Sequence, residues 1–123
     1  MHEFSIVSSI VDAVQEFGEK HEAKKILEVR LAIGKLTYLQ LEQLKFCYTA
    51  ITKATALESS TLEIEEVDAE VACPHCSYRG APKFWEGALN FMPVPTLQCP
   101  KCGNATEAVK GNECAIKSVK YAG

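Results

Sequence analysis

Four of the six cysteines form two pairs, each with two residues between the partners. This spacing lets the chain curl so that both sulfurs of a pair face one ion, and zinc prefers four such ligands in a tetrahedron. A proline follows the first cysteine of each pair and fixes one backbone angle of the turn, while Gly103 permits a positive φ after the second pair. The sequence therefore predicts a zinc site with four thiolate ligands, Cys73, Cys76, Cys99 and Cys102.

The cysteine pairs also have other interpretations. A dithiol oxidoreductase needs one pair at the start of a helix, and two proline-bearing pairs fit that pattern poorly. A zinc ribbon can serve as a protein-interaction or nucleic-acid-binding module. However, residues 72–110 are nearly neutral once four thiolates hold one Zn²⁺, so they offer no row of basic side chains to bind the phosphates of a nucleic acid. His75 is either a solvent-facing spacer or a ligand for a second metal. A closed four-thiolate zinc has no open position, so no hydrolytic enzyme is predicted.

The first three residues, Met1, His2 and Glu3, can chelate a different metal. The amine of Met1, the amide of His2 and the imidazole Nδ1 of His2 close two fused rings, with three nitrogens in one plane. A second arrangement uses the amine of Met1 and the amides of His2 and Glu3, with a side chain from elsewhere as fourth ligand. Both are square-planar nitrogen sites, which suit Ni(II) and Cu(II). The alternative is a solvated terminus in which Glu3 favours the start of a helix.

Composition limits the classes of protein to which the chain can belong. Its 123 residues, 47% of them hydrophobic, are enough for one small domain with an insert. Its formal net charge of -3 gives no reason to expect nucleic-acid binding. No apolar run approaches the roughly 20 residues that span a bilayer, and no basic segment precedes an apolar one as in a secretory signal. We therefore expect a cytoplasmic protein with no membrane contact.

Hydrophobic periodicity predicts the elements that position these residues. The apolar phase slips by one residue at Val67, which indicates either a bulge or a strand that leaves one sheet for another module. Strand alternation places Leu27, Val29, Leu31 and Ile33 inward. The expected order is a helix ending near Gly18, a strand over 27–33, a helix over about 38–56, a strand from 61, and a last strand over 114–121 that lies beside the first.

All five prolines fall between residues 72 and 110, which marks the clearest boundary in the chain. The predicted fold class is α+β, with two helices on a small three-stranded sheet and an inserted zinc-ribbon module. Residues 1–71 together with 111–123 form the expected nickel-binding α/β domain. Residues 72–110 form the expected zinc-binding module.

The motifs together resemble those of the HypA/HybF family of hydrogenase-maturation nickel chaperones. The resemblance rests on M-H-E at residues 1–3, I-G-K-L at 33–36, the two C-x-x-C pairs and K-G-N-E at 110–113, in order along the whole chain. It implies that His2 is the essential nickel ligand, that Glu3 contributes, and that the paired cysteines hold structural zinc.

The resemblance also implies a function without catalysis. Ni(II) is the cargo, and its recipient is the large subunit of a [NiFe]-hydrogenase, reached together with a HypB-type GTPase; some members of the family also serve urease. The sequence does not identify the fourth nickel ligand. The competing function is a zinc-ribbon module that binds protein or nucleic acid and carries an incidental amino-terminal histidine.

Overall fold

The computed structural model of the chain describes residues 2–85 and 94–123. Its contacts divide the chain into two compact units. Unit 1 comprises Met1–Ala32, Leu39–Glu65 and Ala115–Gly123, and unit 2 comprises Ile33–Tyr38 and Glu66–Cys114. Unit 2 thus contains the predicted zinc module, 72–110, together with residues on both sides of it.

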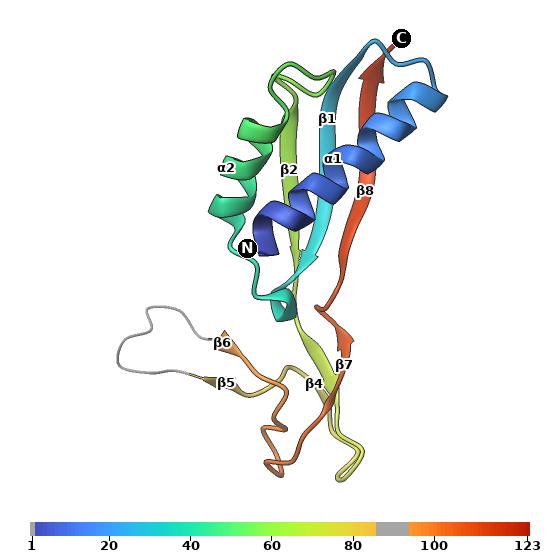
Figure 1. The fold of residues 1–123 in the computed structure, drawn as a ribbon. Coiled ribbons are helices and arrows are strands. Elements are labelled where there is room, and N and C mark those ends of the chain that lie inside the picture. Colours follow the sequence, from blue (N-terminus) through green and yellow to red (C-terminus); the bar gives the residue numbers. More distant parts are fainter. Residues whose placement is uncertain (1, 86–93) are drawn as a thin grey trace. The chain divides into compact units, whose positions relative to one another are not determined.

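The elements follow one another in an order close to the expected one (Figure 1). They are α1 (His2–Lys20), β1 (Lys25–Gly34), the 3₁₀ turn η1 (Lys35–Thr37), α2 (Leu41–Ile51), β2 (Thr61–Val67), β3 (Glu70–Ala72), β4 (Arg79–Gly80), β5 (Phe84–Trp85), β6 (Val94–Pro95), β7 (Glu107–Lys110) and β8 (Cys114–Ala122). No helix among the described residues combines the length and hydrophobicity needed to cross a bilayer.

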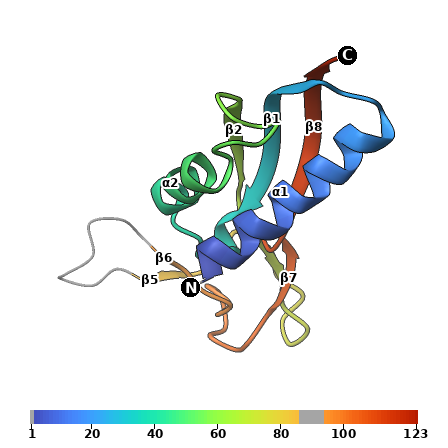
Figure 2. The ribbon, with the colours of Figure 1, turned by 45° about the horizontal axis from the view of Figure 1, so that its top comes forward.

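Unit 1 is built on a three-stranded sheet with strand order β2-β1-β8. The N–H of Lys24 donates to the carbonyl of Ala122 at 2.8 Å, so the start of β1 meets the end of β8 and the two strands are antiparallel. Figures 1 and 2 show β1 and β2 running in the same direction, with both helices on one face of the sheet. The predicted fold class is confirmed, as is the placement of the last strand beside the first.

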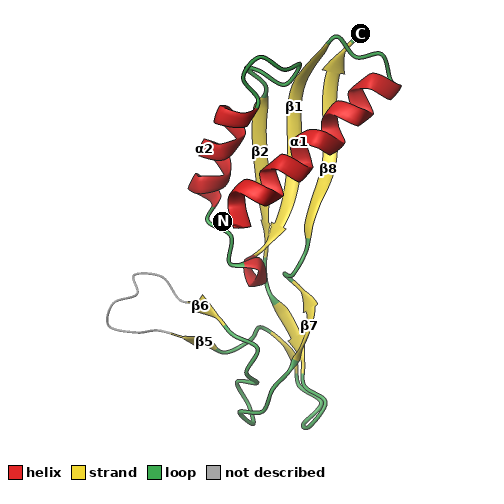
Figure 3. Ribbon diagram, in the orientation of Figure 1, coloured by secondary structure: helices red, strands yellow, loops and turns green. Residues whose placement is uncertain are grey.

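The core of unit 1 lies between the helices and this sheet (Figure 3). It holds twelve buried apolar side chains: Val7, Ile10, Val11, Val14, Ile26, Val29, Leu31, Ala32, Leu44, Cys47, Tyr48 and Leu57. One inward prediction was wrong, because Leu27 is 46% exposed while its neighbour Ile26 is buried. The alternation of β1 shifts by one position before Val29, which turns the earlier side chains to the opposite face.

Helix α2 is shorter at both ends than the predicted range of 38–56. Tyr38 has φ 57 and Ala54 has φ 63, and a left-handed residue cannot continue a right-handed helix. At the carboxyl end, the hydroxyl of Thr52 donates to the carbonyl of Tyr48 at 2.7 Å and the hydroxyl of Thr55 to that of Thr52 at 2.6 Å. Such side chains offer the backbone an alternative to further helical hydrogen bonds.

Unit 2 contains two small antiparallel sheets among the described residues. One has the order β4-β3-β7 and the other pairs β5 with β6. The phase slip near Val67 marks the point where the chain leaves the sheet of β2 and enters that of β3, as one of the two interpretations predicted. The register of β3 against β7 also shifts between Glu70 and Val71, an irregularity of the bulge type.

Two glycines bring three segments of unit 2 into close contact. The N–H of Gly34 donates to the carbonyl of Glu113 at 2.8 Å, and the N–H of Leu36 donates to that of Gly111 at 2.6 Å. A Cβ on Gly34 would overlap the backbone of Gly111, and Gly111 itself has φ +97 with its Cβ position 2.7 Å from the Cα of Ala69. Both positions therefore require glycine.

Replacing Gly111 with alanine is expected to destabilise the protein by roughly 2–4 kcal/mol, since an alanine at this φ is strained and its Cβ overlaps Ala69. The matched control is Gly18→Ala in α1, where a Cβ would meet Ile26 at an ordinary 3.6 Å. That change should stabilise the helix by about 0.5–1 kcal/mol. Denaturant unfolding of both variants measures the difference in their free energies of unfolding. Equal midpoints would show that the close contact of Gly111 with Ala69 does not require glycine.

Candidate metal centre

The four paired cysteines converge in unit 2. Their sulfurs all lie within 4.8 Å of one another, with Cys73 Sγ 3.6 Å from Cys102 Sγ and Cys76 Sγ 3.6 Å from Cys99 Sγ. A tetrahedron with Zn–S bonds of about 2.3 Å has edges of about 3.8 Å, whereas a disulfide needs about 2.05 Å. The spacing therefore fits a four-thiolate zinc site and excludes disulfides between these cysteines.

Two similar turns present the sulfurs. In the first, the N–H of Ser77 donates to the carbonyl of Cys73 at 3.0 Å, and Ser77 has φ 64. In the second, the N–H of Gly103 donates to the carbonyl of Cys99 at 3.0 Å, and Gly103 has φ 80, as the sequence predicted. The residue after each pair thus takes the left-handed conformation, which lets the chain turn away from the cluster of sulfurs while both sulfurs of the pair stay in place.

Hydrogen bonds to sulfur support the charged form that a metal requires. The amides of Lys101 and Cys102 both approach Cys99 Sγ at 3.4 Å. The backbone amide of Asn104, with its side-chain amide 3.4 Å from Cys102 Sγ, lowers the pKa of Cys102 to about 6. A metal-ligating thiol must lose its proton, and these donors favour the thiolate at Cys99 and Cys102, whereas burial and the neighbouring thiols raise the pKa of Cys76 to about 12. The sequence spacing did not reveal the role of Asn104.

The remaining cysteines and His75 lie outside the cluster. His75 is exposed and does not belong to the group of converging ligand atoms, which agrees with the solvent-facing interpretation. Cys47 is buried in the core of unit 1, on the same face of α2 as Leu44 and Tyr48. Cys114 is exposed at the start of β8.

The amino-terminal motif lies at the first turn of α1. Met1 and the side chain of His2 lie outside the described residues, but the backbone of His2 is the first helical position. The carboxylate of Glu3 accepts a hydrogen bond from the backbone N–H of Gln40 at 3.2 Å. Sequence reasoning missed this contact because its partners are 37 positions apart and no periodicity links them.

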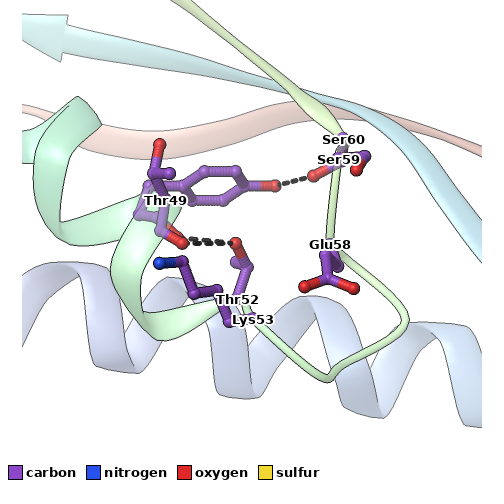
Figure 4. A pocket seen from close by; sticks show the side chains of 7 residues that line it. Thr49, Thr52, Lys53, Glu58, Ser59 and Ser60 are labelled. Atoms are coloured by element: carbon purple, nitrogen blue, oxygen red, sulfur yellow. Dashed lines mark hydrogen bonds between the residues drawn. The ribbon is translucent and has the colours of Figure 1, made fainter.

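A separate depression of about 280 Å³ lies at the carboxyl end of α2 (Figure 4). Its hydroxyl groups are largely engaged within the protein, since Thr52 donates to the backbone of Tyr48 and the Tyr48 hydroxyl pairs with Ser60. Burial raises the pKa of Tyr48. Glu58 accepts from the N–H of Ala54 at 3.3 Å. These contacts end the helix and shape the following turn, so the depression has a structural explanation.

Comparisons with known proteins agree over nearly the whole chain. The family model described as hydrogenase/urease nickel incorporation, metallochaperone, HypA matches residues 1–121. The hydrogenase maturation factor HypA of Methanothermobacter thermautotrophicus is 37% identical over 121 residues, which cover 98% of this chain and 96% of that protein. The protein of the same name from Chlorobium limicola is 36% identical over 120 residues, with coverages of 97% and 95%.

Solved structures share the fold. The solution structure of the Ni metallochaperone HypA from Helicobacter pylori matches 97% of this chain and 96% of its own, with a TM-score of 0.63 at 23% identity. With the family match along the full length, the converging cysteines and the M-H-E start, these findings identify the class of protein. The chain belongs to the HypA family of nickel-incorporation metallochaperones, which are maturation factors for hydrogenase and not enzymes.

Proposed function

We propose that this protein binds Ni(II) at its amino terminus and delivers it to the large subunit of a [NiFe]-hydrogenase. The observation that carries the nickel site is that α1 begins at His2. The first N–H groups of a helix have no intrahelical acceptor, so the amides of His2 and Glu3 are not needed to build α1. A planar site can take the amide of His2 with the amine of Met1 and the His2 imidazole, or both amides with that amine and a fourth ligand from elsewhere.

The expected geometry explains why such a site suits a carrier. Three nitrogens in one plane favour Ni(II) over Zn²⁺, which gains little from a planar set. One coordination position remains for an exchangeable ligand, which allows a recipient to take the metal stepwise. Protons compete for the amine, amides and imidazole, so nickel affinity should weaken as pH falls.

The four-cysteine cluster has a different role in this proposal. Cys73, Cys76, Cys99 and Cys102 would hold Zn²⁺ as a closed structural site, with no position for substrate. Bound zinc supplies folding free energy to a small unit. Nickel and zinc are thus separated by ligand chemistry, because nitrogen ligands in a plane select one ion and a tetrahedron of thiolates selects the other.

We further propose that the protein acts in the cytoplasm with a HypB-type GTPase. The support is membership of the family and the names of relatives, which are hydrogenase maturation factors. The GTPase would supply the timing of transfer, since the planar site itself contains no switch.

Nickel transfer to a nickel-free large-subunit precursor is the direct test. Nickel-loaded protein, mixed with the precursor and the GTPase, should place nickel in the precursor after separation of the proteins. A His2→Ala variant treated identically should deliver no more nickel than buffer containing the metal. Transfer at the same rate from both preparations would contradict delivery from the amino-terminal site.

A further inference from the structure

We infer that the carboxylate of Glu3 is a positioning group for the nickel site, and that the backbone N–H of Gln40 is its anchor. This inference rests on the proposed amino-terminal nickel site. In the structure, Glu3 Oε2 accepts the Gln40 N–H at 3.2 Å. The contact joins the first turn of α1 to the residue that precedes α2, and both lie within unit 1.

Gln40 is well placed to act as an anchor. It is the N-cap of α2, with extended backbone angles of φ −89 and ψ 112, and its side chain makes no capping hydrogen bond. Its carbonyl accepts the N–H of Leu44 at 3.0 Å, so the residue is held by the first turn of α2. Leu44 is fully buried in the core. The donor is therefore fixed by a helix that is itself fixed by the sheet.

The negative charge of the Glu3 carboxylate also lies close to the partial positive charge at the amino ends of α1 and α2. Figures 1 and 2 show the amino end of α1 beside the beginning of α2. Helix amino ends carry partial positive charge, which opposes a cation bound there. The Glu3 carboxylate belongs to the first turn of α1 and accepts a hydrogen bond from the N-cap residue of α2, so its negative charge offsets part of that partial charge. It thereby lowers the electrostatic cost of binding Ni(II) at the first turn of α1 without occupying a coordination position.

Anchoring matters because the proposed ligands belong to a chain end. Helix ends fray, and each backbone residue that must be ordered on binding costs about 1–2 kcal/mol in conformational entropy. A planar site requires the backbone of His2 and Glu3 to hold one geometry. The Glu3–Gln40 bond holds that backbone before the metal arrives, which lowers the ordering cost of binding.

The competing role for Glu3 is direct coordination of nickel by its carboxylate. The two roles make opposite demands on Gln40. A positioning role requires the Gln40 N–H, whereas a coordinating carboxylate has no use for it. Removing the N–H therefore separates the roles.

Gln40→Pro removes this N–H at a backbone φ close to the range of proline, and Gln40→Ala is the matched control that keeps it. Glu3→Ala removes the acceptor and leaves the backbone of α2 unchanged, so the test stands even if proline disturbs that helix. The measurement is Ni(II) affinity and the visible absorption band of the bound nickel, using zinc-loaded protein. The helical circular-dichroism signal reports the fold of each variant.

Gln40→Pro and Glu3→Ala should each weaken nickel binding by roughly fivefold, which corresponds to the typical net contribution of one hydrogen bond. Their combination should weaken it no further, and the absorption band should stay in place. Gln40→Ala should bind as the unmodified protein does. A shifted band in Glu3→Ala, or no effect of Gln40→Pro with its helices intact, would overturn the inference.

A His2→Ala variant measured alongside keeps the two proposals apart. If it retains full nickel binding, the amino-terminal site itself is wrong. If it loses binding while Glu3→Ala and Gln40→Pro have independent, additive effects, the site stands and the positioning role of Glu3 fails.

Discussion

Replacing His2 with alanine is expected to abolish stoichiometric Ni(II) binding and to leave zinc content and fold unchanged. In the proposed site the imidazole would contribute one of the planar nitrogens and close a chelate ring with its own amide, so its removal would take away a ligand and a ring together. Groups that only support a ligand typically cost 10–100-fold in metal affinity when removed. Loss of the ligand should exceed about a hundredfold.

The fold should tolerate this change because α1 is held elsewhere. Val7, Val11 and Val14 are each at most 2% exposed and anchor the helix on the sheet, one or more turns beyond His2. Calorimetric titration with Ni(II), together with zinc analysis of the same samples, measures both expectations. Undiminished binding with full stoichiometry in the variant would exclude His2 as a ligand.

Removing zinc is expected to unfold unit 2 and to leave unit 1 folded. Among the described residues, the buried apolar side chains of unit 2 are few, and two of them are proposed zinc ligands: Ile33, Val71, Cys73, Pro82, Pro95 and Cys99. Unit 1 has twelve. Structural zinc binding contributes about 10–16 kcal/mol in small domains, which is comparable to the whole stability of a typical domain. The described residues of unit 2 bury too few apolar side chains to replace this contribution to its free energy of unfolding.

The chain contains convenient probes for this experiment. Its single tryptophan, Trp85, lies in unit 2, whereas both α-helices, α1 and α2, lie in unit 1. A Cys73→Ser variant, or a strong chelator, should therefore change the tryptophan fluorescence and preserve the helical circular-dichroism signal. Cys114→Ser is the control, because this exposed thiol lies outside the cluster. Simultaneous loss of both signals would show that zinc supports the entire protein.

The convergence of the four paired cysteines was the most predictable part of the structure. Ligand spacing is a local property, and the left-handed turn at Gly103 follows from the same short segment. The place of the last strand beside β1 was predicted as well, whereas the position of β2 on the other side of β1 was not. The phase slip near Val67 was also visible in the sequence and corresponds to the passage of the chain from one sheet to another.

Other features depend on contacts that no local pattern encodes. Ile33–Tyr38 belongs to unit 2, although the sequence prediction placed this segment in the first domain. The close approach of Gly34 and Gly111 places it there, together with a hydrogen bond from the Tyr38 hydroxyl to the carbonyl of Pro95 at 2.7 Å. Such contacts join residues more than fifty positions apart. The boundary between the units was therefore beyond the reach of composition alone.

The amino-terminal motif shows a different limit. Three residues at a chain end have no periodicity, so their chemistry rather than their pattern made them candidates. No sequence pattern indicated that Glu3 contacts Gln40, because the acceptor and donor meet only when α1 and α2 pack on the same face of the sheet.

A Ni(II) titration of zinc-loaded protein with a native amino terminus, run beside protein with extra residues ahead of Met1, tests the central claim most directly. An added segment converts the amine of Met1 into an amide and leaves the cysteine cluster untouched. The protein with a native amino terminus should bind one nickel tightly. The protein with extra residues ahead of Met1 should lose that site. Equal nickel binding by both proteins would contradict the amino-terminal site and place the metal elsewhere in the chain.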